Sequence, residues 1–201
     1  MKNVVTDRNG EALHTPAFIK SLFNHPLAGL LWLVLRVWVG WQWLNAGLEK
    51  FKSPAWMQTG VALKGFWMGA IVVPAKGMAP IHYAWYRSFL QMLLNANAYT
   101  WFAKFITIGE ILVGIAMILG VFTWFSALMG GLMNFNYMLA GSASVNPMFF
   151  FISILLVLAW KVAGYFGADY FLVPWFASLF GQKKEQRETI PAGLPRGAQA
   201  R

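Results

Sequence analysis

The sequence contains no cysteine and few charged residues, and both absences exclude whole classes of protein. Without cysteine, the chain forms no disulfide and supplies no thiolate to a metal site or an iron–sulfur cluster. Only 11% of its 201 residues are charged, whereas about 25% are charged in ordinary soluble domains. Because 58% of the residues are hydrophobic, the composition predicts a protein that lies in lipid.

The apolar residues gather in four runs of about twenty residues, the helix length that crosses a hydrocarbon core roughly 30 Å thick. We therefore predict an all-α integral membrane protein, a bundle of four transmembrane helices. The predicted spans are residues 28–48, 99–119, 121–140 and 147–166. We expect residues 28–175 to form one membrane domain, after a polar segment over 1–27 and before a mostly disordered tail over 176–201.

The long connection between the first two spans, residues 49–98, is interrupted by three prolines and cannot be one helix. Its apolar segment 60–73 is too short to cross the membrane and contains Lys64, which favours a re-entrant or interfacial position. Residues 83–94 can form a helix on the membrane surface. The sequence thus predicts an interfacial helical cap between the first and second spans.

The formal net charge is +9, yet the chain has no recognisable nucleic-acid motif, so the lipid bilayer is the expected partner. Basic residues are more numerous in the two terminal segments than in the long connection. The positive-inside rule therefore favours cytoplasmic N- and C-termini and an extracytoplasmic cap.

Three charged residues lie inside the predicted spans: Arg36, Glu110 and Lys161. A charge at the bilayer centre costs about 2.5 to 3.5 kcal/mol, so each needs a partner or a route to the interface. Arg36 and Glu110 lie at similar depths in the predicted spans, which favours an ion pair, and Lys161 is close enough to a span end to snorkel. The Arg36–Glu110 pair either clamps the bundle or handles a proton or ligand.

Two spans carry stripes of small and polar residues at helical spacing, which predict the faces that meet inside the bundle. The stripe on the first span comprises Arg36, Gly40, Trp43, Gly47 and Lys50. The stripe on the third span comprises Gly130, Asn134, Tyr137 and Gly141. We expect the two stripes to face each other.

Cations dominate the cap, where Glu49 is the one acid among residues 49–98. Lys50, Lys52, Arg87 and His82 are candidates for binding a small oxyanion near the outer end of the first span. The alternative is a basic surface that faces lipid headgroups. No histidine lies in a predicted span, so we expect no haem or metal bound by this chain, and any electron transfer must use a diffusible cofactor or a partner subunit.

The order and spacing of several motifs resemble a known family. The residues that carry the resemblance are Arg36, Gly47-Leu48-Glu49-Lys50-Phe51, Gly109-Glu110, Gly114, Gly120, Thr123, the stretch 134–147, and Lys161, Gly164, Gly167, Asp169 and Tyr170. In this order they resemble the DoxX superfamily of small four-helix membrane proteins, and the last group is similar to its DoxD branch.

The resemblance implies a small subunit of a thiosulfate:quinone oxidoreductase in a prokaryotic cell membrane. It would pass electrons from thiosulfate to diffusible quinone together with a DoxA-like second subunit. In that scheme Arg36 and Glu110 are the candidate catalytic pair, while Glu49, Asn134, Lys161 and Asp169 are structural polar residues. The alternative implied function is a non-catalytic DoxX-like subunit that anchors or organises a larger membrane complex.

Overall fold

The protein is entirely helical over residues 15–188, the part of the chain that this computed structural model describes, with side chains described as far as Ser178. The helices are α1 (Ala17–Asn24), α2 (Ala28–Lys52), α3 (Pro54–Met57), α4 (Val61–Ile71), α5 (Ala84–Asn95), α6 (Tyr99–Leu119), α7 (Thr123–Leu139), α8 (Asn146–Leu158), α9 (Trp160–Ala163) and α10 (Asp169–Glu188). The prediction of an all-α protein is therefore confirmed for these residues.

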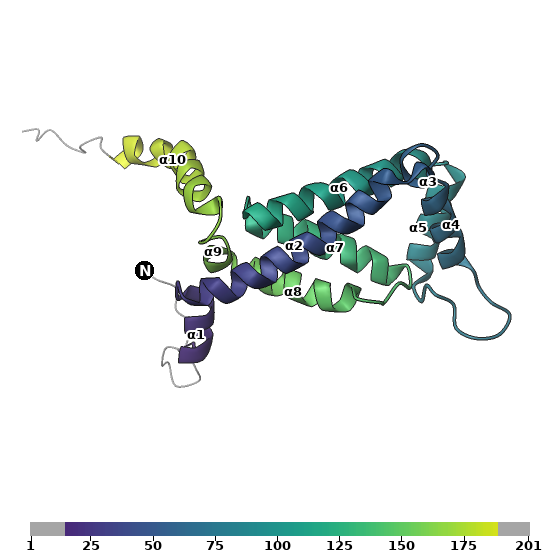
Figure 1. Cartoon of the computed structure of the whole chain (residues 1–201), viewed down its shortest axis with the longest axis horizontal. Helices are drawn as coiled ribbons and strands as arrows, with labels where there is room; N and C mark the ends of the chain where they lie inside the picture. Colours follow the sequence, from purple (N-terminus) through teal and green to yellow (C-terminus); the bar gives the residue numbers. More distant parts are fainter. Residues whose placement is uncertain (1–14, 189–201) are drawn as a thin grey trace, which may run out of the picture.

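Helices α2, α6, α7 and α8 run side by side as the body of the molecule, and α3, α4 and α5 cover one end of it (Figure 1). At the opposite end, α1 and α10 project away from the body. Helix α6 has the predicted bounds, whereas α2 continues beyond the predicted end of its span to Lys52.

Helices α2 and α6 pack so closely that their glycines are required at the contact. A Cβ on Gly114 would lie 2.5 Å from the backbone nitrogen of Leu44, and one on Gly40 would lie 2.8 Å from the Cβ of Met117. Small residues at such contacts let two backbones approach and gain van der Waals attraction, which drives helix association in lipid.

The turn between α6 and α7 is capped by a residue from much later in the chain. Gly120 ends α6 in the left-handed conformation (φ 69°), and Phe122 precedes α7 with φ 45°. The two carboxylate oxygens of Asp169 accept hydrogen bonds from the backbone N–H groups of Phe122 and Thr123, at 2.6 and 2.7 Å. Asp169 thus satisfies donors that the start of α7 would otherwise leave unpaired.

The fourth predicted span, 147–166, is not one continuous helix. Helix α8 ends at Leu158, Ala159 interrupts it with φ −87° and ψ 9°, and the short α9 follows. Helix α8 packs against α7 in part through the stacked rings of Phe135 and Phe150, whose centroids are 5.7 Å apart.

The cap consists of α3, α4, α5 and the segment 72–83, as the interrupted sequence of this connection predicted. It has a hydrophobic core of its own, which continues into the ends of α6 and α7. The buried residues of this core are Leu63, Trp67, Ala70, Ile81, Tyr86, Leu90, Ala103 and Ala140.

The terminal segments differ from the predictions. The segment predicted as polar contains the helix α1, which lies on the surface with none of its residues buried. The tail predicted as mostly disordered continues as α10 to Glu188, because residues 169–180 are largely apolar and helix-compatible despite Pro174. The remainder of both predicted segments, 1–14 and 189–201, lies outside the described residues.

Among residues 15–188, α6 is the one helix that is long and apolar enough to cross a membrane by itself. Helices α1 and α2 meet that criterion together, as a pair bent by 59°. Helix α8 is apolar but has only 13 residues, and α7 has 17.

Candidate functional site

A buried carboxylate, Glu110, lies at the centre of a three-residue group in the bundle. Its Oε2 is 2.7 Å from the ammonium of Lys50 on α2, and its Oε1 accepts a hydrogen bond of 2.7 Å from the hydroxyl of Tyr137 on α7. The side chain of Glu110 is 1% exposed and that of Lys50 is 20% exposed. We call Lys50, Glu110 and Tyr137 the carboxylate triad.

The predicted ion pair between Arg36 and Glu110 is wrong. Arg36 lies against Gly120, where a Cβ would be 1.8 Å from the guanidinium, about ten residues or 15 Å along α6 from Glu110. The prediction assumed that residues equally far from the ends of their predicted spans lie at the same level in the bundle. The glycine contacts between α2 and α6 instead fix a register in which Gly47 packs against Glu110 and Ile111.

Arg36 is buried at the other end of α2 and has a separate set of partners. Its guanidinium donates to the backbone carbonyl of Phe166 at 3.1 Å and to the hydroxyl of Thr123 at 3.5 Å. Asp169, also buried, supplies the nearby negative charge. Arg36 therefore joins α2 to the α6–α7 turn and to the segment before α10, which supports the interpretation of Arg36 as a clamp.

The two predicted interior stripes do face each other. Arg36 bonds to Thr123, the indole nitrogen of Trp43 lies 2.9 Å from a Cβ built on Gly130, and Lys50 shares Glu110 with Tyr137. In each case the residue on α7 is 87 positions after the residue on α2, so the two helices run parallel in one register. On α7 the stripe ends at Tyr137, because Gly141 lies beyond the helix and is exposed.

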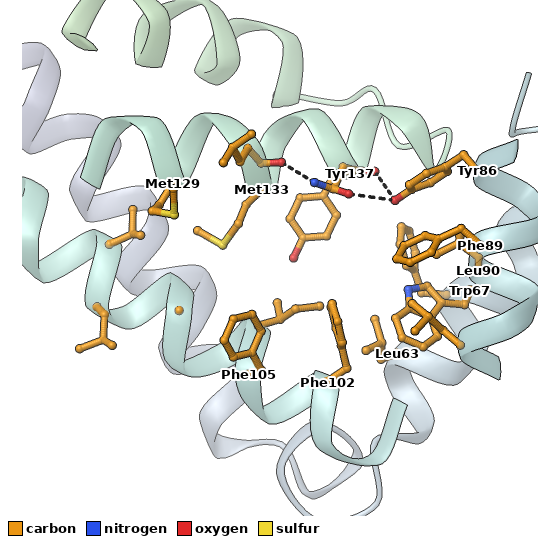
Figure 2. Close-up of a pocket in the computed structure, with 18 of the residues that line it drawn as sticks. Leu63, Trp67, Tyr86, Phe89, Leu90, Phe102, Phe105, Met129, Met133 and Tyr137 are labelled. Carbon is orange, nitrogen blue, oxygen red and sulfur yellow. Dashed lines mark hydrogen bonds between the residues drawn. The ribbon is translucent and has the colours of Figure 1, made fainter. Parts of the chain in front are cut away.

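An apolar cavity of about 460 Å³ lies between α6 and α7, beneath the cap. Its walls include Leu63 and Trp67 from α4, Tyr86, Phe89 and Leu90 from α5, Phe102, Phe105, Gly109 and Leu112 from α6, and Met129, Met133 and Tyr137 from α7. Figure 2 shows the ring of Tyr137 projecting from α7 into the space between the two helices. The cavity thus reaches the carboxylate triad through Tyr137.

The hydroxyl of Tyr86 connects the cap to α7 at the edge of this cavity. It donates to the backbone carbonyl of Asn136 at 3.1 Å (Figure 2). Burial raises the pKa of the Tyr86 hydroxyl above its usual value, so this group stays protonated and able to donate.

The four predicted oxyanion-binding residues are not gathered in one place. Lys50 is engaged with Glu110, whereas Arg87, in the first turn of α5, donates to the backbone carbonyl of Ile81. Lys52 and His82 are exposed. No described hydrogen bond or ion pair joins any two of the four, and an oxyanion site built from them stays a prediction.

The other predicted polar residues have different environments. Asn134 is fully buried on the α7 stripe, and neither atom of its amide has a hydrogen-bond partner. Asp169 is buried as a helix cap, Glu49 is exposed, and the exposed Lys161 has its ammonium 5.7 Å from the ring centroid of Trp160.

Tyr137 was not predicted as a functional residue, although its spacing placed it on the interior stripe. A phenol at a stripe position, within a span otherwise free of ionisable groups, was the available signal. The cavity itself had no such signal, because its apolar walls are indistinguishable from lipid-facing positions in the sequence.

No curated protein and no solved structure matches this chain. The DoxX family profile matches residues 31–142, which include most of α2, the cap, α6, α7 and every member of the carboxylate triad. The chain is therefore a membrane protein that belongs to the DoxX family.

Proposed function

We propose that this chain is the membrane subunit of a thiosulfate:quinone oxidoreductase-like system and that the cavity between α6 and α7 receives the quinone ring. The observation that carries the proposal is the position of Tyr137, whose ring lines an apolar cavity while its hydroxyl bonds to a buried carboxylate. A cavity of about 460 Å³ is within the range of roughly 300 to 1,000 Å³ common for small-molecule sites.

Quinone reduction consumes two electrons and two protons, and the carboxylate triad can handle the protons. A proton on Glu110 can pass to the oxygen of Tyr137 while the phenol proton passes to a quinone oxygen. Lys50, 2.7 Å from the same carboxylate and partly exposed, can return a proton from water. The two transfers within the chain, from Lys50 to Glu110 and from Glu110 to Tyr137, each cross a distance of 2.7 Å.

The electrons come from outside this chain in the proposed system. Two thiosulfate ions lose one electron each to form tetrathionate, and the quinone accepts both electrons. The chain has no cysteine to hold a redox cluster, so we assign electron delivery to a DoxA-like partner subunit.

For the membrane arrangement, we propose four crossings made by α2, α6, α7 and the α8–α9 pair in a prokaryotic cell membrane. Helix α2 has 25 residues, and α8 with α9 extends from Asn146 to Ala163, close to the length of one crossing. The N- and C-termini then share the cytoplasmic side, and the cap lies outside.

The quinone site can be tested by filling the cavity at Gly109. A Cβ at this position would meet only the sulfur of Met133, at 3.9 Å, so Gly109→Leu extends into the cavity without a backbone clash. We expect this variant, co-purified with the partner, to lose quinone reduction and the binding of decylubiquinone measured by tryptophan fluorescence.

The matched control is Gly65→Leu on α4, where an added Cβ meets nothing within 4 Å and the cavity is not involved. It should bind decylubiquinone as the parent protein does. Unchanged binding and turnover in Gly109→Leu would place the quinone elsewhere.

A second candidate function is a non-catalytic subunit that anchors or organises a larger membrane complex. The close glycine packing of α2 against α6 and the buried Arg36 clamp favour a rigid scaffold. Purification at fixed stoichiometry with an unrelated complex, together with intact quinone turnover in Tyr137→Phe, would support this candidate over the first.

A further inference from the structure

The carboxylate triad lies near one end of the seam between α2 and α7. The parallel register of these helices orders the buried polar groups along the seam, from Arg36 at one end through Trp43 to Lys50 at the other. The two ends differ in how the seam meets the surroundings, and this difference bears on the route of a proton.

Toward Arg36, the seam is closed by apolar packing. Val39 on α2 and Met117 on α6 are both fully buried there. The contact of Gly40 with Gly114 brings the backbones of α2 and α6 together. On this side of Glu110, the indole N–H of Trp43 and the amide of Asn134 are buried and without partners, and the buried hydroxyl of Ser126 donates to the backbone carbonyl of Thr123. No described ionisable group bridges the distance from there to Arg36.

Toward α3, the seam is open. The ammonium of Lys50 is the group next to Glu110, and its side chain is 20% exposed at the end of α2. It lies 5.3 Å from the ring centroid of Trp56, a position that keeps the ammonium over the mouth of the seam. Lys50 therefore lies between Glu110 and the surroundings at the α3 end.

We infer that the proton used at Tyr137 exchanges with water only at the α3 end, through Glu110 and Lys50, so that the triad is a one-sided proton path with Lys50 as its gate. This inference rests on the proposed function for the use of the proton. The accessibility of Glu110 from one end is a property of the fold and can be measured without quinone.

The absence of cysteine makes the path directly measurable by cysteine substitution. In oriented proteoliposomes, Glu110→Cys should react with a small charged methanethiosulfonate added on the cap side. Reagent added on the other side should react about tenfold more slowly or not at all. Adding Lys50→Ala to this variant should speed the cap-side reaction by about tenfold, because the gate is removed.

Val39→Cys, at a fully buried position on the closed side, is the matched control and should stay unreactive from both sides. Equal rates for Glu110→Cys from the two sides, or a faster reaction from the Arg36 side, would overturn the inference. The same measurement on Tyr137→Cys provides a second probe of the path if Glu110→Cys does not fold.

The unmodified complex supplies an independent test. Thiosulfate oxidation to tetrathionate releases no proton, so quinone reduction alone takes up protons during turnover. We expect the uptake on the cap side, followed with pH indicators trapped inside and added outside the vesicles. Uptake on the opposite side contradicts the one-sided path, whereas absence of quinone reduction contradicts the proposed function and leaves the cysteine measurement valid.

Discussion

At the scale of single residues, Glu110 is stabilised by Lys50 and Tyr137 and not by Arg36. Both contacts of the Glu110 carboxyl group are 2.7 Å long. The loss of either Lys50 or Glu110 leaves the remaining charged group without its partner in a water-poor environment. This costs more free energy than the loss of both members of the pair.

We therefore predict coupling between Lys50 and Glu110 in a double-mutant cycle. Glu110→Gln and Lys50→Met should each lower the unfolding free energy in detergent by about 1 to 3 kcal/mol, a range that allows for the partial exposure of Lys50. The double variant should be less destabilised than the sum. The cycle between Glu110→Gln and Arg36→Met should be additive, and coupling there would contradict the observed register.

The second prediction for single residues concerns the two glycines that lie against the guanidinium of Arg36. Gly120 and Gly167 both face it, and an added Cβ would lie 1.8 and 2.5 Å away. Gly120→Ala should destabilise the protein by about 2 to 4 kcal/mol, because it adds strain at φ 69° to the clash.

Gly69→Ala provides the control for this substitution. Its Cβ meets nothing within 4 Å on α4, so thermal unfolding should be unchanged or slightly improved. A Gly120→Ala protein as stable as the Gly69→Ala protein would show that Arg36 moves away without cost.

The sequence predicted which residues are interior but not which of them touch. The stripe spacing placed Arg36, Trp43 and Lys50 correctly on one face of α2, which is buried at Arg36 and Trp43 and partly exposed at Lys50. Charge complementarity then suggested the partner of opposite sign at the same nominal depth, Glu110 for Arg36. The partner was decided by backbone contact at glycines, a property of the pair of helices that neither helix displays alone.

At the scale of elements, the contact between α2 and α6 positions the triad. A Cβ added to Gly114 would lie 2.5 Å from the backbone nitrogen of Leu44. Even one methyl group at this position would therefore push the two helices apart. Such a separation changes the distance from Lys50 to Glu110, although neither residue is altered.

Gly114→Ala is therefore expected to lower stability by about 1 to 3 kcal/mol and to reduce quinone reduction as well. Gly109→Ala on the same helix meets only the sulfur of Met133, at 3.9 Å, and should affect neither property strongly. Thermal unfolding and turnover of the two variants, measured side by side, check this expectation. Equal behaviour would mean that the contact of α2 with α6 is not what positions the triad.

Predictions at the element scale were best where an uninterrupted apolar run ended at a clear boundary. Helix α6 begins and ends where predicted, because Gly120 stops it in a left-handed conformation. The fourth span was predicted less well, since the break at Ala159 has no glycine or proline to announce it. Helix α2 extends to Lys52, beyond the predicted end of the span at residue 48, as the position of Lys50 on the helical stripe had indicated.

At the scale of the whole molecule, the cap and α10 lie at opposite ends of the bundle (Figure 1). This arrangement supports opposite membrane sides for the two regions. Lys52→Cys and Gly77→Cys should therefore react with an impermeant thiol reagent in intact cells, while Gln182→Cys should react only after lysis. The reverse pattern would invert the proposed orientation and place the mouth of the proton path in the cytoplasm.

The capping of α7 by Asp169 also has a consequence for biogenesis. The N–H groups of Phe122 and Thr123 receive their acceptor from a residue synthesised 46 positions or more later. While the ribosome is still making α8, these donors are therefore unsatisfied by their final partner. The hydrogen bonds that cap α7 can form only after the segment with Asp169 has been synthesised. The turn in the middle of the chain is therefore completed by a residue near its C-terminal end.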